Sequence, residues 1–235
     1  MKPALPVLLP IILFALIGHP DTARAQKESV NPGINKNYKN PELDVTEWVE
    51  RFEREGREVY DHKENIIKST GVKKGDVVAD VGAGTGLFTM MFSQKVGSEG
   101  KVLAVDIATP FLARIHQRAE EQGIQNIETI LCTDRNARIK KQSADIIFIC
   151  DAYHHFEYPS DTLKTLHWGL KDDGVLVLVD FERVPGKSSD WILSHVRAGK
   201  ETFASEIEAA GFEKFEEADF LKENYLLKFR KKKQP

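Results

Sequence analysis

The chain alternates between short apolar runs and longer segments in which apolar residues recur at helical spacing. Beyond residue 76 the runs are rich in Val and Ile and too short for typical helices, so each predicts a buried strand. These strands are expected at Val77–Val81, Val102–Val105, Ile127–Cys132, Asp145–Cys150 and Val175–Phe181. Helical spacing predicts helices at Leu87–Val96, Pro110–Gln122, Ser160–Leu170 and Glu201–Ala210. This alternation predicts an α/β fold, with a mostly parallel sheet covered by helices on both faces.

The segments on either side of this alternating region have different patterns. Asp44–Arg54 and Arg57–Thr70 predict two amphipathic helices, which would form an N-terminal helical cap over residues 44–71. At the other end, Phe212–Phe220 and Tyr225–Phe229 predict an antiparallel hairpin at the edge of the sheet. We therefore expect one domain over residues 72–231, followed by a basic tail at 232–235.

The first 43 residues predict two further segments. Residues 1–25 combine a positive start at Lys2, an apolar stretch over Leu5–Ile17 and the small-x-small sequence Ala23-Arg24-Ala25. This pattern predicts a cleaved signal peptide, a secreted or periplasmic protein and no stable membrane span after cleavage; an uncleaved anchor is the alternative. Residues 26–43 contain Asn31-Pro32-Gly33 and Asn40-Pro41 and predict an extended linker.

Composition narrows the classes of function. The 235 residues are 41% hydrophobic and 29% charged, which is typical of a globular protein. The formal net charge is −3, so we expect no nucleic-acid partner. The two cysteines, Cys132 and Cys150, exclude a disulfide scaffold and a four-cysteine zinc site, and the sequence leaves open whether they pair.

A glycine-rich loop is the strongest chemical signal in the chain. It follows the first expected strand, and its glycines stand at Gly82, Gly84 and Gly86. Glycine permits positive φ and lets a ligand approach bare backbone. A dinucleotide-binding loop would place its third glycine at position 87, which is Leu87. An NAD(P)-dependent oxidoreductase is therefore a less favoured alternative.

Two acidic residues accompany this loop. Asp80 precedes it and suits a cationic ligand better than a pyrophosphate. Asp106 ends the next expected strand, 20 residues beyond Gly86, where an acid can accept both hydroxyls of a ribose. Together the glycines and acids indicate a site for a cationic nucleoside.

The segment from Asp80 to Gly86 resembles the first motif of the class I S-adenosylmethionine-dependent methyltransferases, and Asp106 matches that family's ribose-binding acid. The resemblance implies a Rossmann-like seven-stranded sheet in the order 3-2-1-4-5-7-6, with the last strand antiparallel. It also implies S-adenosyl-L-methionine as cofactor and in-line methyl transfer to O, N or S of a small-molecule acceptor. The cofactor-binding residues expected from it are Asp80, Gly82, Ala83, Gly84, Gly86, Asp106, Ile107, Thr133, Asp134 and Asp151. Asp80 would either orient the loop or bind the ammonium group of the cofactor through water. Tyr60, on the second N-terminal helix, could close over the cofactor as a lid, and plain packing is the alternative.

The acceptor side is expected just after the fourth strand, where Tyr153, His154 and His155 are the candidate catalytic residues. We expect no metal there, because adjacent histidines in an extended segment point in opposite directions. Farther along, Trp191, His195 and Arg197 could shape the acceptor pocket, with Arg197 binding an anionic acceptor. A secreted cofactor-binding protein without turnover is the second alternative.

Overall fold

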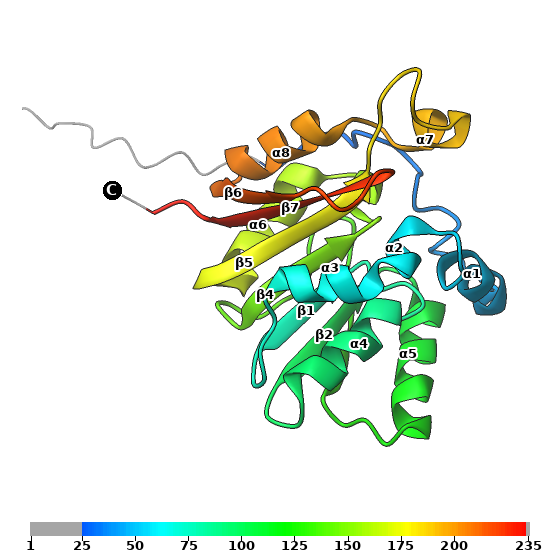
Figure 1. Cartoon of the computed structure of the whole chain (residues 1–235), viewed down its shortest axis with the longest axis vertical. Helices are drawn as coiled ribbons and strands as arrows, with labels where there is room; N and C mark the ends of the chain where they lie inside the picture. The colour runs from blue at the N-terminus through cyan, green and yellow to red at the C-terminus, as the bar shows by residue number, and fades with distance from the viewer. Residues whose placement is uncertain (1–24, 234–235) are drawn as a thin grey trace, which may run out of the picture.

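The computed structural model describes residues 25–233, and its centre is one seven-stranded sheet (Figure 1). The strand order is β3-β2-β1-β4-β5-β7-β6, in which β7 runs antiparallel to both β5 and β6. This confirms the expected topology. The strands are β1 Val77–Val81, β2 Lys101–Asp106, β3 Ile127–Leu131, β4 Ala144–Cys150, β5 Leu170–Phe181, β6 Phe212–Ala218 and β7 Asn224–Lys231.

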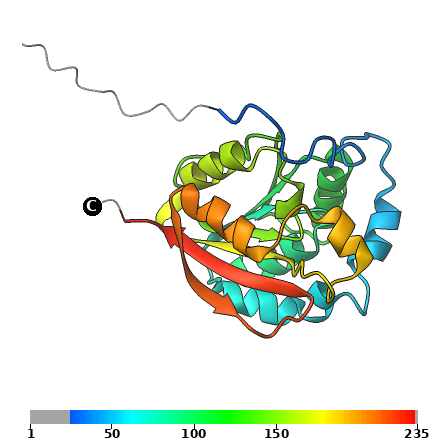
Figure 2. The same ribbon diagram turned by 90° about the horizontal axis from the view of Figure 1, so that it is seen from above.

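The helices lie on both faces of the sheet, as Figure 2 shows from above. The expected helix over Arg57–Thr70 is divided at His62 into two shorter ones. The helices are α1 Val45–Phe52, α2 Glu58–Asp61, α3 Lys63–Thr70, α4 Leu87–Val96, α5 Thr109–Glu121, α6 Pro159–Gly169, α7 Asp190–His195 and α8 Lys200–Ala209, with a 3₁₀ helix, η1, at Tyr153–His155.

Side chains that alternate along the strands form a separate core on each face. On one face, strand residues such as Ile147 and Leu176 pack with Leu163 of α6 and Phe203 of α8. On the other face, strand residues such as Phe148 pack with the helices α3 and α4. The continuous apolar runs of β1, β2 and β4 follow from this burial on both sides. The buried strand expected at Ile127–Cys132 is a correction: β3 lies at the edge of the sheet, and none of its residues is buried.

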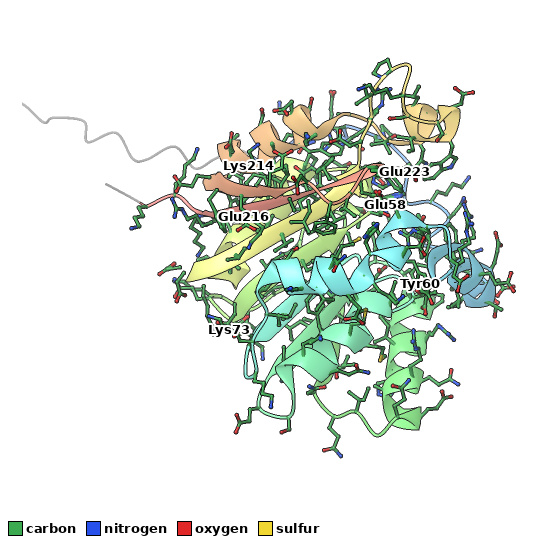
Figure 3. All side chains as sticks on the ribbon, viewed as in Figure 1. Glu58, Tyr60, Lys73, Lys214, Glu216 and Glu223 are labelled. Atoms are coloured by element: carbon green, nitrogen blue, oxygen red, sulfur yellow. The ribbon has the colours of Figure 1, made fainter. Side chains whose placement is uncertain are left out.

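Glu58 fixes the N-terminal helices to the start of β7, beside the carboxyl end of β5. Its carboxylate accepts hydrogen bonds from the backbone N–H groups of Lys222, Glu223 and Asn224, at 2.6–2.8 Å. Glu58 on α2 and Glu223 lie next to each other in Figure 3. This contact holds the helical segment at the edge of the sheet where the parallel strands end.

The structure contradicts the extended linker predicted for residues 26–43. The segment is not extended: turns occupy most of residues 31–42, and the segment packs onto the domain. The backbone N–H of Val30 donates to the Glu157 carbonyl, and the side-chain amide of Asn35 donates to the His155 carbonyl. The prolines and glycine that predicted a linker instead serve as turn residues.

Three expectations concern the ends and the cysteines. The predicted signal peptide lies, except for Ala25, outside the described residues, as do the last two residues of the tail. In residues 25–233, no helix is long and apolar enough to cross a membrane. Cys132 and Cys150 are both free; they follow β3 and end β4, which are separated by two strands, or about 14 Å at the spacing of a sheet, too far for a disulfide.

Candidate active site

The glycine loop adopts the backbone that its sequence predicts. Gly82, Gly84 and Gly86 have φ of +76°, +52° and +88°, which only glycine adopts without strain. A Cβ at Gly82 would lie 2.4 Å from the Cβ of Ala152, and one at Gly86 would lie 2.7 Å from Ile115. These two glycines are thus required by packing, whereas Gly84 faces the open cavity beside Phe52.

Asp106 holds this loop while keeping acceptor capacity. One carboxylate oxygen accepts the Gly84 N–H at 2.8 Å, and the other accepts the Ala108 N–H at 2.8 Å. A carboxylate has about four acceptor positions, so the backbone N–H groups of Gly84, Ile107 and Ala108 leave at least one for a ligand. Burial raises the pKa of Asp106, while the hydrogen bonds from the backbone oppose that rise.

Two adjoining cavities lie at this edge of the sheet. The larger, of about 800 Å³, extends from the loop residues to the histidines after β4. The smaller, of about 110 Å³, lies beside Asp106. Gly82, Gly84 and Asp151 line both, which makes them parts of one site.

The expected cofactor-binding residues divide between these cavities. Asp80 and Ala83 line the larger one, whereas Asp106, Ile107, Thr133 and Asp134 line the smaller one. Gly86 lies behind the loop, against Ile115. The structure therefore brings most of the predicted set together around one continuous space.

Asp80 is buried beneath the loop, where it also lines the larger cavity. Its carboxylate accepts a 2.6 Å hydrogen bond from the Thr89 hydroxyl. Burial raises the pKa of Asp80 to about 7, against the lowering effect of this hydrogen bond. Of the two roles expected for Asp80, this geometry favours orienting the loop.

Asp151 is paired with the positively charged side chain of Arg57. Its carboxylate forms a 2.6 Å ion pair with Arg57 and accepts a 2.7 Å hydrogen bond from the Asn224 amide. Arg57 also donates to the Phe52 carbonyl and lines the larger cavity. Sequence analysis missed Arg57, because nothing in its helical pattern distinguishes it from an exposed arginine.

The aromatic wall of the site also differs from the expectation. The ring of Tyr60 on α2 (Figure 3) packs against the Lys63 amino group, 3.8 Å from the ring centroid, and Tyr60 lines neither cavity. Tyr38 lines both, 4.9 Å from the Trp48 ring and 5.1 Å from the His155 ring. Tyr38, in the segment predicted to be a linker, therefore lines the site, whereas Tyr60 does not.

Of the candidate catalytic residues, the two histidines line the larger cavity and Tyr153 does not. Tyr153 lines neither cavity; its ring is buried in the core and its hydroxyl donates to Glu206 at 2.8 Å. Arg197 forms an ion pair with the same Glu206, so the predicted binding of an anionic acceptor by Arg197 has no support in its position. We therefore drop Tyr153 and Arg197 from the site.

The two adjacent histidines do face the larger cavity, and His195 joins them there together with Trp191. Residues 153–155 form the 3₁₀ helix η1 and are not extended, so the His154 and His155 rings turn to the same side, with centroids 4.4 Å apart. The geometric reason given above for excluding a metal is therefore wrong. The site nitrogens of His154, His155 and His195 all lie within 4.8 Å of one another.

Burial sets the charge of this histidine group. The pKa of His155 is lowered to about 2 by burial and by the neighbouring His154 and His195, and the pKa of His195 is lowered chiefly by burial. Both rings are consequently neutral at pH 7.

Comparison with known proteins agrees with this arrangement. Residues 78–174 match a family model described as "Methyltransferase domain". This part of the chain is therefore similar to a methyltransferase domain. This confirms the resemblance that the loop and Asp106 indicate.

Curated relatives match about half of this chain. The ubiquinone/menaquinone biosynthesis C-methyltransferase UbiE of Marinomonas sp. is 30% identical over 122 residues, covering 52% of this chain and 49% of that protein. The 2-phytyl-1,4-naphtoquinone methyltransferase of Nostoc sp. is 30% identical over 122 residues, covering 52% and 53%. The chain thus spans about half the length of the curated relatives it matches.

Among solved structures, a SAM-dependent methyltransferase from Aquifex aeolicus has the same fold. Its TM-score is 0.70 at 22% identity, and the match covers 80% of this chain and 98% of that one. At this identity the likeness supports the fold alone.

Proposed function

We propose that this protein is an S-adenosylmethionine-dependent methyltransferase acting on a small-molecule acceptor. The observation that carries the proposal is the glycine loop with its acid: Gly84 presents bare backbone to the cavity, and Asp106 lines the adjoining cavity with an acceptor position left for a ribose hydroxyl. The family match over residues 78–174 supports the same reaction class.

The two cavities suit the two parts of this cofactor. The smaller, beside Asp106, Thr133 and Asp134, would take the nucleoside. The larger, beside Gly84 and the Trp48 ring, would take the methionyl part and the acceptor. Aromatic faces suit a sulfonium because they attract a cation without forming an ion pair that methyl transfer would have to break.

Methyl transfer needs alignment more than a strong base. Holding the methyl carbon and the acceptor atom about 3–3.5 Å apart and in line lowers the barrier by several kcal/mol. The acceptor would approach from the end of the larger cavity that is lined by His155, Trp191 and His195. We propose that the histidines, and not Tyr153, contact the acceptor.

The identity of the methylated atom is open within this proposal. The sequence favours O, N or S, whereas the names of the curated relatives above include C-methyltransferases of quinone biosynthesis. An acceptor panel should therefore include phenols, amines, thiols and quinone precursors.

Calorimetry with S-adenosylhomocysteine tests cofactor binding. The intact protein should bind it. Asp106→Ala should weaken binding about 10- to 100-fold, since a hydrogen bond to a charged group is worth about 1.5–3 kcal/mol, and Gly84→Val should abolish binding. Unchanged affinity in both variants would contradict the site. Binding of NADH in place of S-adenosylhomocysteine would favour the oxidoreductase, and binding without methyl transfer to any acceptor in the panel would favour the non-catalytic alternative.

The secreted or periplasmic location is part of the proposal and rests on the pattern of residues 1–25 alone. N-terminal sequencing of the protein from its native host should find a mature chain that begins at Gln26. A chain that retains Met1 and sediments with membranes would indicate the uncleaved anchor.

A further inference from the structure

The acceptor end of the larger cavity holds three histidines in a geometry that suits a metal ion. His155 Nε2 and His195 Nε2 are 3.3 Å apart. Two imidazole nitrogens bound to one tetrahedral zinc ion, each at about 2.0–2.1 Å, lie about 3.3–3.4 Å apart. The pair therefore has the spacing of two ligands before any movement. One ring nitrogen of each of His154, His155 and His195 lies within 4.8 Å of the other two.

The third histidine has the support that metal ligands usually have. His154 Nδ1 is 2.8 Å from an Asp180 oxygen, and the His154 backbone N–H donates to the other Asp180 oxygen. This arrangement fixes the tautomer with the proton on Nδ1 and leaves the lone pair of Nε2 for a ligand. A carboxylate behind a metal-bound histidine is the commonest partner of this kind.

The burial of Asp180 adds to this reason. The residue is 0% exposed, and its carboxylate accepts from the His154 ring and from the backbone N–H groups of His154 and Phe181. A buried carboxylate is stable only when its charge is compensated. A dication held by the histidines would compensate it through the His154 ring.

We propose that His154, His155 and His195 bind one divalent transition-metal ion, with Asp180 positioning His154. Three imidazoles with a fourth, open position are typical of a catalytic zinc site, and imidazole also suits iron, copper and nickel. This inference rests on the proposed function: the open coordination position of the metal would take a hydroxyl or thiol group of the acceptor. These groups ionise more readily beside a metal.

The reaction would then proceed as follows. The acceptor's O–H or S–H bond breaks, and its proton leaves to solvent. The lone pair of that oxygen or sulfur forms the new bond to the methyl carbon, while the carbon–sulfonium bond breaks and its electron pair stays on sulfur. The acceptor class is thereby narrowed to small molecules with an ionisable hydroxyl or thiol.

Metal binding can be measured without any methyl acceptor. The full chain, stripped with a chelator, is titrated with Zn²⁺ against a chromophoric competitor, and Co²⁺ is added separately so that its visible absorption reports the coordination. We expect one Zn²⁺ per chain and the intense Co²⁺ bands of a tetrahedral site. His195→Ala should weaken Zn²⁺ binding at least about 100-fold, and Asp180→Asn about 10- to 100-fold.

His116→Ala is the matched control, because His116 is an exposed histidine on α5 paired only with Glu120 among its described ion pairs. It should leave Zn²⁺ affinity unchanged. His195 lies on the short helix α7 at the cavity rim, so its variant should keep the fold, which circular dichroism checks. If it does not, the stoichiometry and Co²⁺ spectrum of the intact chain decide.

Two results would overturn the proposal: less than one Zn²⁺ per chain in the intact protein, or equal Zn²⁺ affinities in His195→Ala and His116→Ala. The affinity for S-adenosylhomocysteine, measured on the same metal-free protein, reports the proposed function separately. Failure of one measurement therefore does not imply failure of the other.

Discussion

The ion pair between Arg57 and Asp151 joins the helical segment to the end of β4, directly beside the glycine loop. The side chains are 19% and 6% exposed, and their nearest atoms are 2.6 Å apart. Breaking a buried pair by removing one partner costs about 3–5 kcal/mol, because the other charge is left without compensation. Since Arg57 is partly exposed, we expect Arg57→Met to lower the free energy of unfolding by about 3 kcal/mol.

A double-mutant cycle separates this pair from ordinary packing. Asp151→Asn keeps the size of the side chain and should cost less than Arg57→Met, since an arginine at 19% exposure can reach water. In the double variant neither charge is left alone, so its loss should be smaller than the sum of the single losses by about 2 kcal/mol. Urea unfolding at pH 7 measures all four proteins.

The acid dependence gives a second check on the same reasoning. Burial raises the pKa of Asp151 above its ordinary value, and Arg57 opposes that rise. Without Arg57 the folded-state pKa rises further, so the folded variant takes up a proton more readily than the unfolded chain as pH falls. The deficit of Arg57→Met should therefore shrink between pH 7 and pH 4. Additive losses to within about 0.5 kcal/mol, or a deficit that does not depend on pH, would refute this account.

Three further predictions follow from the loop and its lid. Gly82→Ala should lower the free energy of unfolding by about 2–4 kcal/mol, since the new Cβ would meet Ala152 at 2.4 Å and φ is +76°. Gly97→Ala, where φ is +67° but the space is open, should lower it by only about 1–2 kcal/mol. Equal losses in urea unfolding would contradict the packing argument. Because the pKa of Asp80 is raised, the folded state binds more protons than the unfolded state between pH 4 and about 7. The stability of the wild-type protein should therefore fall with rising pH in this range, by up to ~1.4 kcal/mol per pH unit, and Asp80→Asn should remove that contribution. Parallel profiles of stability against pH for the two proteins would argue against this account. Tyr38→Ala should weaken S-adenosylhomocysteine binding about tenfold in calorimetry without changing the fold, and an unchanged affinity would exclude Tyr38 as a lid.

The sequence by itself determined the sheet and the loop. The central strands β1, β2 and β4 are buried on both faces, which leaves continuous Val- and Ile-rich runs in the sequence. Three glycines at the end of β1 are required where φ is positive. Asp106 was predictable because its position at the end of β2 follows from the same pattern. Such features depend on local chemistry and on strand order, which sequence patterns record.

Only the tertiary structure decided what closes the site and what its histidines can do. Tyr38 and Arg57 reach the cavity from segments far from it in sequence, so no local pattern distinguishes them. Tyr153 and His154 are neighbours, yet one hydroxyl enters the core and one ring faces the cavity, because a single 3₁₀ turn sets their directions. The approach of His195 depends on where α7 packs after a long connection, and such long-range contacts are fixed by the packing of the whole domain.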